Sequence, residues 1–188
     1  MRTASHRPKI LVRQAITPEE QAEAGRVTEE AYREFAHKFE PGEWEDYAKT
    51  LPEVQSRIEQ GVLLLAIDDD GRIVGTVTFY PEPAPASTHW RPDDATMRFL
   101  AVRPSYRNRG VARALVQECI ERARALGKNR LALQTTTHMT GAIEMYRRSG
   151  FLRDIYGDQT WGSFLLVGFA LVLDNRTPPP APVEQNPA

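Results

Sequence analysis

The chain has 188 residues, 41% of them hydrophobic, and a formal net charge of −1, which suits one domain with one packed core. Its longest apolar candidate, residues 164–173, is about half as long as a membrane-spanning helix, and the amino terminus lacks the apolar run of an export signal. A lone Cys119 excludes an internal disulfide, so these features together predict a cytoplasmic protein without a membrane partner.

The first half of the chain predicts a strand, two helices and a β-hairpin. Thr17 supplies an N-cap, Pro18 a first helical residue, and Glu20 completes a capping box. Two apolar runs of strand length flank an Asp-rich turn at 68–71. In chain order, the expected elements are a strand at 10–12, helices at 18–35 and 43–59 with a break near residue 52, strands at 62–67 and 73–80, and a proline-rich loop at 81–94.

The second half alternates strands and helices. Val111, Leu115 and Cys119 begin an apolar face with helical spacing, and Gly127 is a typical helix stop. We expect residues 1–8 to be flexible and the Pro-rich residues 175–188 to be a disordered tail, which leaves a single domain at 9–174. The expected elements are a strand at 97–102, a helix that follows residues 107–112 and ends at 127, a strand at 131–134, a helix at 141–148, and strands at 151–156 and 164–173.

Charge is distributed unevenly along the chain. Residues 1–96 carry 11 Lys and Arg against 18 Asp and Glu, a net −7, whereas residues 97–188 carry 13 against 7, a net +6. The second half therefore suits an anionic ligand and the first half a cationic one. Solvated helix faces are the alternative explanation of these counts.

Residues 103–110 lead from a buried strand through an arginine-rich turn into a helix. The first turn of a helix leaves backbone N–H groups unpaired and carries the positive end of the helix dipole, so an anion is stabilised there. Gly110 and Ala112 are small enough to let phosphate oxygens approach these amides, and Arg107 and Arg109 add positive charge. The turn is a candidate pyrophosphate site, with an ordinary strand-to-helix turn as the alternative. Neither the Rossmann nor the P-loop spacing occurs in the chain.

Residues 100–104, LAVRP, are followed by the pattern R-x-x-G-x-A at Arg107, Gly110 and Ala112. This segment resembles motif A of the GNAT family of N-acetyltransferases. The order of the expected elements is also similar to that family from about residue 9 to 173. The resemblance implies an α/β (α+β) fold with a mixed, mostly antiparallel sheet of about seven strands flanked by four helices. It further implies that the fourth and fifth strands are parallel and splayed, and that acetyl-CoA is the co-substrate.

Residues 142–151, with the pattern A-x-x-x-Y-x-x-x-G-F, resemble motif B of the same family. Many members have Asn where this chain has Met139, so a polar contact to the cofactor is missing or replaced. Residues 135–138 are candidates to replace it, unless they form a solvated turn. By resemblance, with the pantetheine arm pairing at the splayed strands, the cofactor-binding residues are Leu100, Ala101, Val102, Arg107, Asn108, Arg109, Gly110, Val111, Ala112, Arg113, Thr136, Met139, Ala142 and Tyr146.

The resemblance implies transfer of an acetyl group to a primary amine of a small molecule or peptide, by direct attack through a tetrahedral intermediate. The backbone N–H of Leu100 is the expected oxyanion donor. Tyr146 is the expected general acid, because a phenol is protonated at neutral pH and can give its proton to the departing thiolate. The general base stays unassigned: Thr96 stands where members often have Glu, and the carboxylates within residues 43–46 could deprotonate or attract an amine but are more typical of a solvated helix.

A catalytically silent acyl-CoA-binding sensor or regulatory module is the alternative function, supported by Met139 and Thr96. The acidic first half favours a cationic amine as the acceptor. Basic residues without interleaved aromatic residues argue against a nucleic-acid partner, and no metal site is expected. We expect a monomer or a homodimer.

Overall fold

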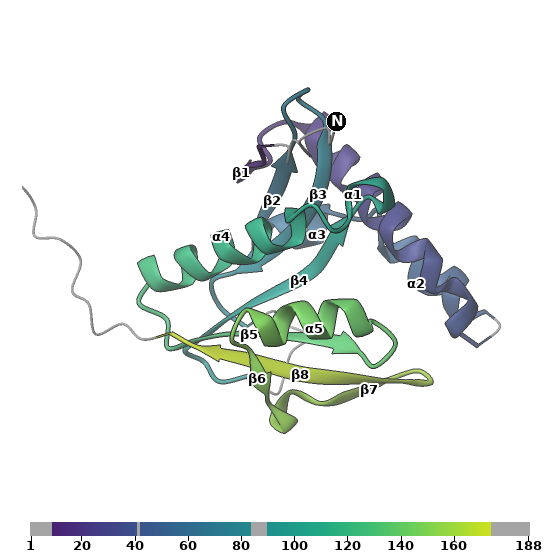
Figure 1. Ribbon diagram of the computed structural model, residues 1–188. Coiled ribbons are helices and arrows are strands. Elements are labelled where there is room, and N and C mark those ends of the chain that lie inside the picture. Colours follow the sequence, from purple (N-terminus) through teal and green to yellow (C-terminus); the bar gives the residue numbers. More distant parts are fainter. Residues whose placement is uncertain (1–8, 41, 84–89, 174–188) are drawn as a thin grey trace, which may run out of the picture.

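The computed structural model describes residues 9–40, 42–83 and 90–173 (Figure 1). Its strands form one mixed sheet in the order β1-β2-β3-β4-β5-β8-β6, with β7 also paired to β8. The neighbours β4 and β5 are parallel, and the other pairs are antiparallel. The strands are β1 (Leu11–Gln14), β2 (Val62–Ile67), β3 (Ile73–Tyr80), β4 (Asp94–Val102), β5 (Arg130–Thr136), β6 (Leu152–Arg153), β7 (Gln159–Trp161) and β8 (Phe164–Val172).

Helices cover both faces of the sheet (Figure 1). The α-helices are α1 (Pro18–Tyr32), α2 (Glu43–Thr50), α3 (Gln55–Ile58), α4 (Val111–Ala125) and α5 (Thr140–Arg148). Short 3-10 helices lie at η1 (Arg33–Lys38), η2 (Pro104–Tyr106) and η3 (Ile155–Gly157). The capping box at the start of α1 is confirmed, since Thr17 accepts a hydrogen bond from the N–H of Glu20 and the Glu20 side chain reaches back to the N–H of Thr17.

The apolar run in β2 reads as continuous because each face of this strand is buried under a different helix. Leu64 belongs to the larger core cluster together with Leu115 of α4. Leu65, which points to the other face, packs in a second cluster with Ala24 of α1. A strand buried on both sides has no polar alternation, which is why the sequence shows none.

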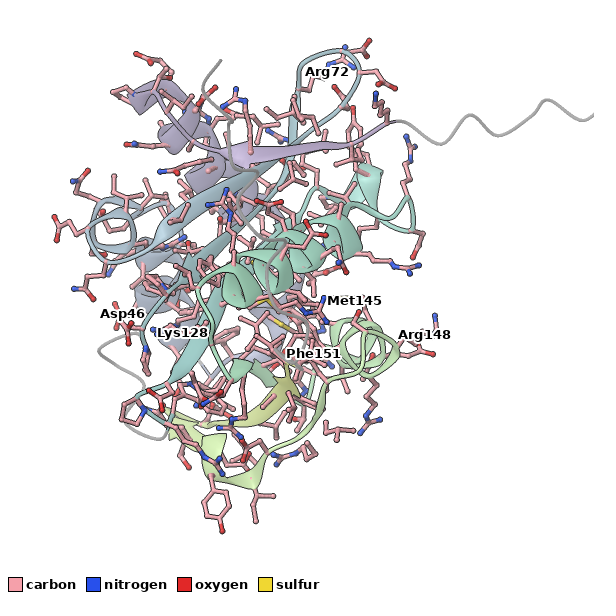
Figure 2. The ribbon with its side chains drawn as sticks, turned by 90° about the vertical axis from the view of Figure 1, so that its left-hand side faces the viewer. Asp46, Arg72, Lys128, Met145, Arg148 and Phe151 are labelled. Atoms are coloured by element: carbon pink, nitrogen blue, oxygen red, sulfur yellow. The ribbon has the colours of Figure 1, made fainter. Side chains whose placement is uncertain are left out.

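α4 and α5 share one face of the sheet. Figure 2 shows Met145 on the side of α5 that faces α4 and Arg148 on the opposite side. Met145 packs against the larger core, whereas the Arg148 side chain is exposed and pairs only with Glu144, one turn away on the same helix. Cys119 lies in this core as expected, and its burial raises the pKa of its thiol.

The expected fold class is confirmed, with eight strands and five α-helices in the described residues instead of about seven and four. The strand expected at 151–156 was wrong. Only Leu152 and Arg153 pair with β8, and Asp154 then accepts a hydrogen bond from the N–H of Tyr156 and turns the chain into η3.

The strand expected at 97–102 begins earlier, at Asp94, whose carboxylate accepts two hydrogen bonds from Arg130 of β5. The N-terminal residues 1–8 and the tail at 175–188 lie outside the described residues. No helix in the described ranges is both long enough and apolar enough to cross a bilayer.

Candidate active site

The parallel strands β4 and β5 separate after a short shared stretch. They pair only from Asp94–Thr96 to Arg130–Ala132. Beyond these positions β4 continues beside β3 and β5 continues beside β8, so the facing edges of β4 and β5 lose their strand partner (Figure 1). This divergence confirms the expected splay, and it leaves backbone groups of β4 available to an extended ligand.

A bulge interrupts β4 where the two strands separate. Thr76 of β3 pairs with Ala101 and Thr78 pairs with Arg98, so Phe99 and Leu100 together oppose a single residue of β3. Phe99 has a φ of 56°, a left-handed conformation that a bulky side chain seldom adopts. Such bulges redirect backbone amides and side chains, and they are frequent next to active sites. Leu100, the expected oxyanion donor, therefore follows a backbone kink.

The turn before α4 has the backbone shape of an anion site. Asn108 and Gly110 have φ values of 60° and 88°, and they flank Arg109. Alternating left-handed residues bring successive N–H groups to one side of the chain. The first backbone hydrogen bond of the helix runs from the N–H of Ala114 to the carbonyl oxygen of Gly110, at 3.0 Å. The N–H groups before Ala114 therefore have no partner within the helix.

Gly110 has a backbone conformation that favours glycine, and the space beside it is open. Its φ of 88° disfavours any side chain, and a Cβ added there would meet no protein atom within 4 Å. The open space on this side is where a diphosphate would approach the amides. Of the three residues that follow Gly110, Val111 has its side chain buried in the core, so only its backbone could contact a ligand. Ala112 packs partly against the core, and Arg113 is exposed.

The arginines of this turn have partners within the protein. The guanidinium of Arg107 donates to Glu34 at 2.6 Å and to the carbonyl oxygen of Ala31 at 3.1 Å, both on the α1 side of the turn. The Arg109 guanidinium lies 5.3 Å from the centre of the Tyr106 ring. The positive charge of Arg107 is thus engaged by residues of α1 and η1.

The unequal charges of the two halves are partly explained by ion pairs between them. Arg103 pairs with Glu23 and Glu30 of α1, and Arg107 pairs with Glu34. Acidic residues of the first half therefore neutralise arginines of the second half. Part of the acidic excess on which the prediction of a cationic acceptor rested is therefore neutralised by ion pairs within the protein.

Tyr146 lies on α5 and is buried against the larger core, with its ring 5.8 Å from that of Phe151. Burial, followed by the nearby Tyr32 phenol and Cys119, raises the pKa of Tyr146 above its ordinary value. The phenol therefore holds its proton throughout the neutral range. Ala142, one turn earlier, packs partly against the same core.

A cavity of about 130 Å³ opens beside the β4 bulge. Its walls come from both sides of the splayed strands and from the helices above them, and aromatic rings predominate. The lining residues are Tyr32, Phe35, Lys38 and Phe39 of α1 and η1, Tyr47 of α2, Arg98 and Phe99 of β4, Gln134 and Thr136 of β5, His138 and Met139 before α5, and Leu166 of β8.

Two of the expected cofactor residues, Thr136 and Met139, lie at this cavity. Met139 is the N-cap residue of α5, and its sulfur accepts a contact from the Thr135 hydroxyl at 3.5 Å. No sequence pattern predicted the aromatic wall, because its rings come from separate segments. Thr96, which stands where the family often has Glu, is buried, and its hydroxyl has no hydrogen-bond partner among the described residues.

Comparison with known proteins places this site in a family context. Residues 28–151 match the family model described as Acetyltransferase (GNAT) family. N-acetyltransferase 8B of Rattus norvegicus is 31% identical over 112 residues, which cover 58% of this chain and 48% of that protein. The chain spans about half the length of the curated relatives it matches.

Two solved structures share the fold at low sequence identity. An acetyltransferase of the GNAT family from Staphylococcus aureus Mu50 superposes with a TM-score of 0.66 at 16% identity, covering 88% of this chain and 99% of that one. The PaiA N-acetyltransferase of Thermoplasma acidophilum, solved in complex with coenzyme A, gives a TM-score of 0.65 at 16% identity, with coverages of 85% and 98%.

Proposed function

Because the chain belongs to the GNAT family of acetyltransferases, we propose that it transfers an acetyl group from acetyl-CoA to a primary amine. The observation that carries this proposal is the splay of β4 and β5 close to the turn before α4, whose backbone conformation suits an anion. Residues 9–174 would form the catalytic domain. Cytoplasmic location and a monomeric or homodimeric state stay predictions.

The residues of the turn fit the diphosphate of coenzyme A. Unpaired N–H groups of Val111, Ala112 and Arg113 would receive the phosphate oxygens, with the glycine at 110 leaving the approach open. The pantetheine arm would lie along the free edge of β4 at Leu100 and Val102. Coenzyme A is the ligand of the Thermoplasma structure, which has the same fold.

In the proposed reaction the amine nitrogen attacks the thioester carbonyl and a C–N bond forms. The negative charge on the carbonyl oxygen is stabilised by the N–H of Leu100, which the β4 bulge redirects. The tetrahedral intermediate collapses as the C–S bond breaks. The nitrogen loses one proton and the thiolate gains one, which gives an N-acetyl product and coenzyme A.

Tyr146 would supply the proton to the thiolate. Its raised pKa keeps the phenol protonated, as a general acid requires. For the removal of the amine proton, His138 lines the cavity, and its imidazole ring has a nitrogen that can accept a proton. We assign it as the acceptor of the amine proton.

A silent acyl-CoA-binding module is the second candidate, because no carboxylate is among the residues that line the cavity and Thr96 cannot act as a base. Thiol release from acetyl-CoA, measured with a panel of amines, separates the two. Turnover of at least one amine is expected. Tight binding of coenzyme A without turnover of any amine would favour the module.

The role of Tyr146 is tested in the same assay with Tyr146→Phe. We expect kcat to fall by a factor of about 10²–10⁴, the range for losing a general acid, with little change in the KM for acetyl-CoA. Tyr156→Phe is the matched control, since Tyr156 is 76% exposed on η3. Equal kcat values for the two variants would remove Tyr146 from the mechanism.

A further inference from the structure

Two arginines meet at the ring of Phe99, and neither has an acidic partner among the described residues. The guanidinium carbon of Arg57 lies 3.7 Å from the centre of this ring, and that of Arg98 lies 5.3 Å from it. No carboxylate of the described residues forms an ion pair with either arginine, whereas Arg103 and Arg130 each pair with two. The pair therefore holds two positive charges in excess beside the cavity.

Arg57 is the more deeply buried of the two, at 4% exposure. Its Nη2 donates to the carbonyl oxygens of Thr50 and Leu51 at the end of α2, at 2.8 and 2.7 Å. Its Nη1 is buried and has no hydrogen-bond partner in the described part of the chain. A buried cation that lacks a counter-charge destabilises the fold, so an anion nearby would be favoured.

The surrounding phenols do not provide this anion. Burial raises the pKa of Tyr32 to about 12 and also raises the pKa values of Tyr47 and Tyr80. All three are therefore neutral near pH 7. Desolvation, with Arg98 acting in the same direction, lowers the pKa of Arg57. The three phenols near the two arginines are thus neutral, and each arginine has the other as its charged neighbour.

The cavity at this place combines one charged wall with an apolar body. Arg98 lines it directly, and Arg57 stands behind Phe99. Lys38 is a further cation among the lining residues, and rings such as Phe35 and Phe39 form part of the wall. A ligand that fits needs an anionic group and an apolar or aromatic portion.

We propose that the acetyl acceptor is a small amine that also carries a carboxylate, as amino acids with apolar side chains do. The carboxylate binds Arg98, with Arg57 completing the positive charge behind Phe99, and the apolar portion contacts the aromatic wall. This inference rests on the proposed acetyltransferase function. It replaces the cationic acceptor expected from the acidic first half of the sequence.

The test compares matched acceptors that differ only in the carboxylate: L-phenylalanine, its primary amide and phenethylamine. We expect kcat/KM to be about 10- to 100-fold higher for L-phenylalanine, the range for one charge-assisted hydrogen bond. Arg98→Gln should remove this preference by raising the KM for L-phenylalanine, and Arg98→Lys should restore part of it. Arg124→Gln is the control, because Arg124 is exposed on the last turn of α4.

A binding measurement separates this inference from the proposed function. N-acetyl-L-phenylalanine is titrated by calorimetry into the protein saturated with coenzyme A, and into the Arg98→Gln variant. Binding that depends on Arg98 supports the carboxylate site even if no amine is turned over. Equal or faster acetylation of phenethylamine, or product binding unaffected by Arg98→Gln, would overturn the inference and leave the acetyltransferase function standing. Arg57 is not the test residue, since its bonds to α2 make folding depend on it.

Discussion

The two ends of α4 offer a matched pair of glycines for testing the diphosphate site. Gly110 precedes the helix with a φ of +88° and Gly127 follows it with a φ of +67°, and an added Cβ would meet no protein atom within 4 Å at either position. Replacement by alanine therefore introduces backbone strain without a clash. We expect both Gly110→Ala and Gly127→Ala to lower the free energy of unfolding by about 1–2 kcal/mol.

Only one of these variants should affect coenzyme A. The Cβ at position 110 occupies the open side of the amides at the start of α4, and relief of its strain turns these amides away from a common centre. Losing one charge-assisted hydrogen bond raises Kd by about 10- to 100-fold. Urea denaturation gives the stabilities and calorimetry with coenzyme A gives the Kd values. An unchanged Kd for Gly110→Ala, or equal increases for both variants, would refute the assignment of the turn to the diphosphate.

Two further predictions concern the fold. A Cβ at Gly157 would lie 2.1 Å from the Trp90 ring, so Gly157→Ala should lower the free energy of unfolding by about 1–3 kcal/mol, as measured by urea denaturation. Gly141→Ala is the control, because the space around Gly141 is open, and it should not have this effect. Equal urea midpoints for the two variants would contradict this prediction. The hydrogen bond from Arg13 comes first among the causes that lower the pKa of Glu20 to about 2. Since the unfolded value is about 4.3, this carboxylate stabilises the fold above pH ~4.3 and the contribution is lost as the pH falls toward 2. Glu20→Gln should thus be less stable than the parent at pH 7 and equally stable near pH 2, and a difference independent of pH would show that the ion pair is not the cause.

The sequence predicts best those elements whose limits are set by neighbouring residues. The hairpin strands β2 and β3 have the expected bounds, because the Asp-rich turn between them is held locally: Asp68 accepts hydrogen bonds from the N–H groups of Asp70 and Arg72. The turn before α4 was likewise visible in its glycine and arginines. These signals act over a few residues, so a pattern reveals them.

The errors arose where distant residues decide the structure. β4 begins at Asp94, which pairs with Arg130, 36 positions away. The strand expected at 151–156 ends at Arg153, and Asp154 in the turn that follows forms an ion pair with the same distant Arg130. The cavity was missed for the same reason, since Phe99 faces rings from other elements and Arg57 reaches it from α3. Charge counts along the chain could not show that Arg57 has no acidic partner in the part of the chain that the structure describes.

The left-handed conformation of Phe99 ties two parts of the site to one peptide group. The ring of Phe99 contacts the acceptor cavity, and the same residue's ψ sets the direction of the following N–H, that of Leu100. In the proposed reaction, an acceptor that pushed this ring aside would also tilt the N–H of Leu100, the proposed oxyanion donor. Under the proposed function, poorly fitting amines would therefore be rejected by slow turnover as well as by weak binding, so the kcat values of different acceptors would differ along with their KM values.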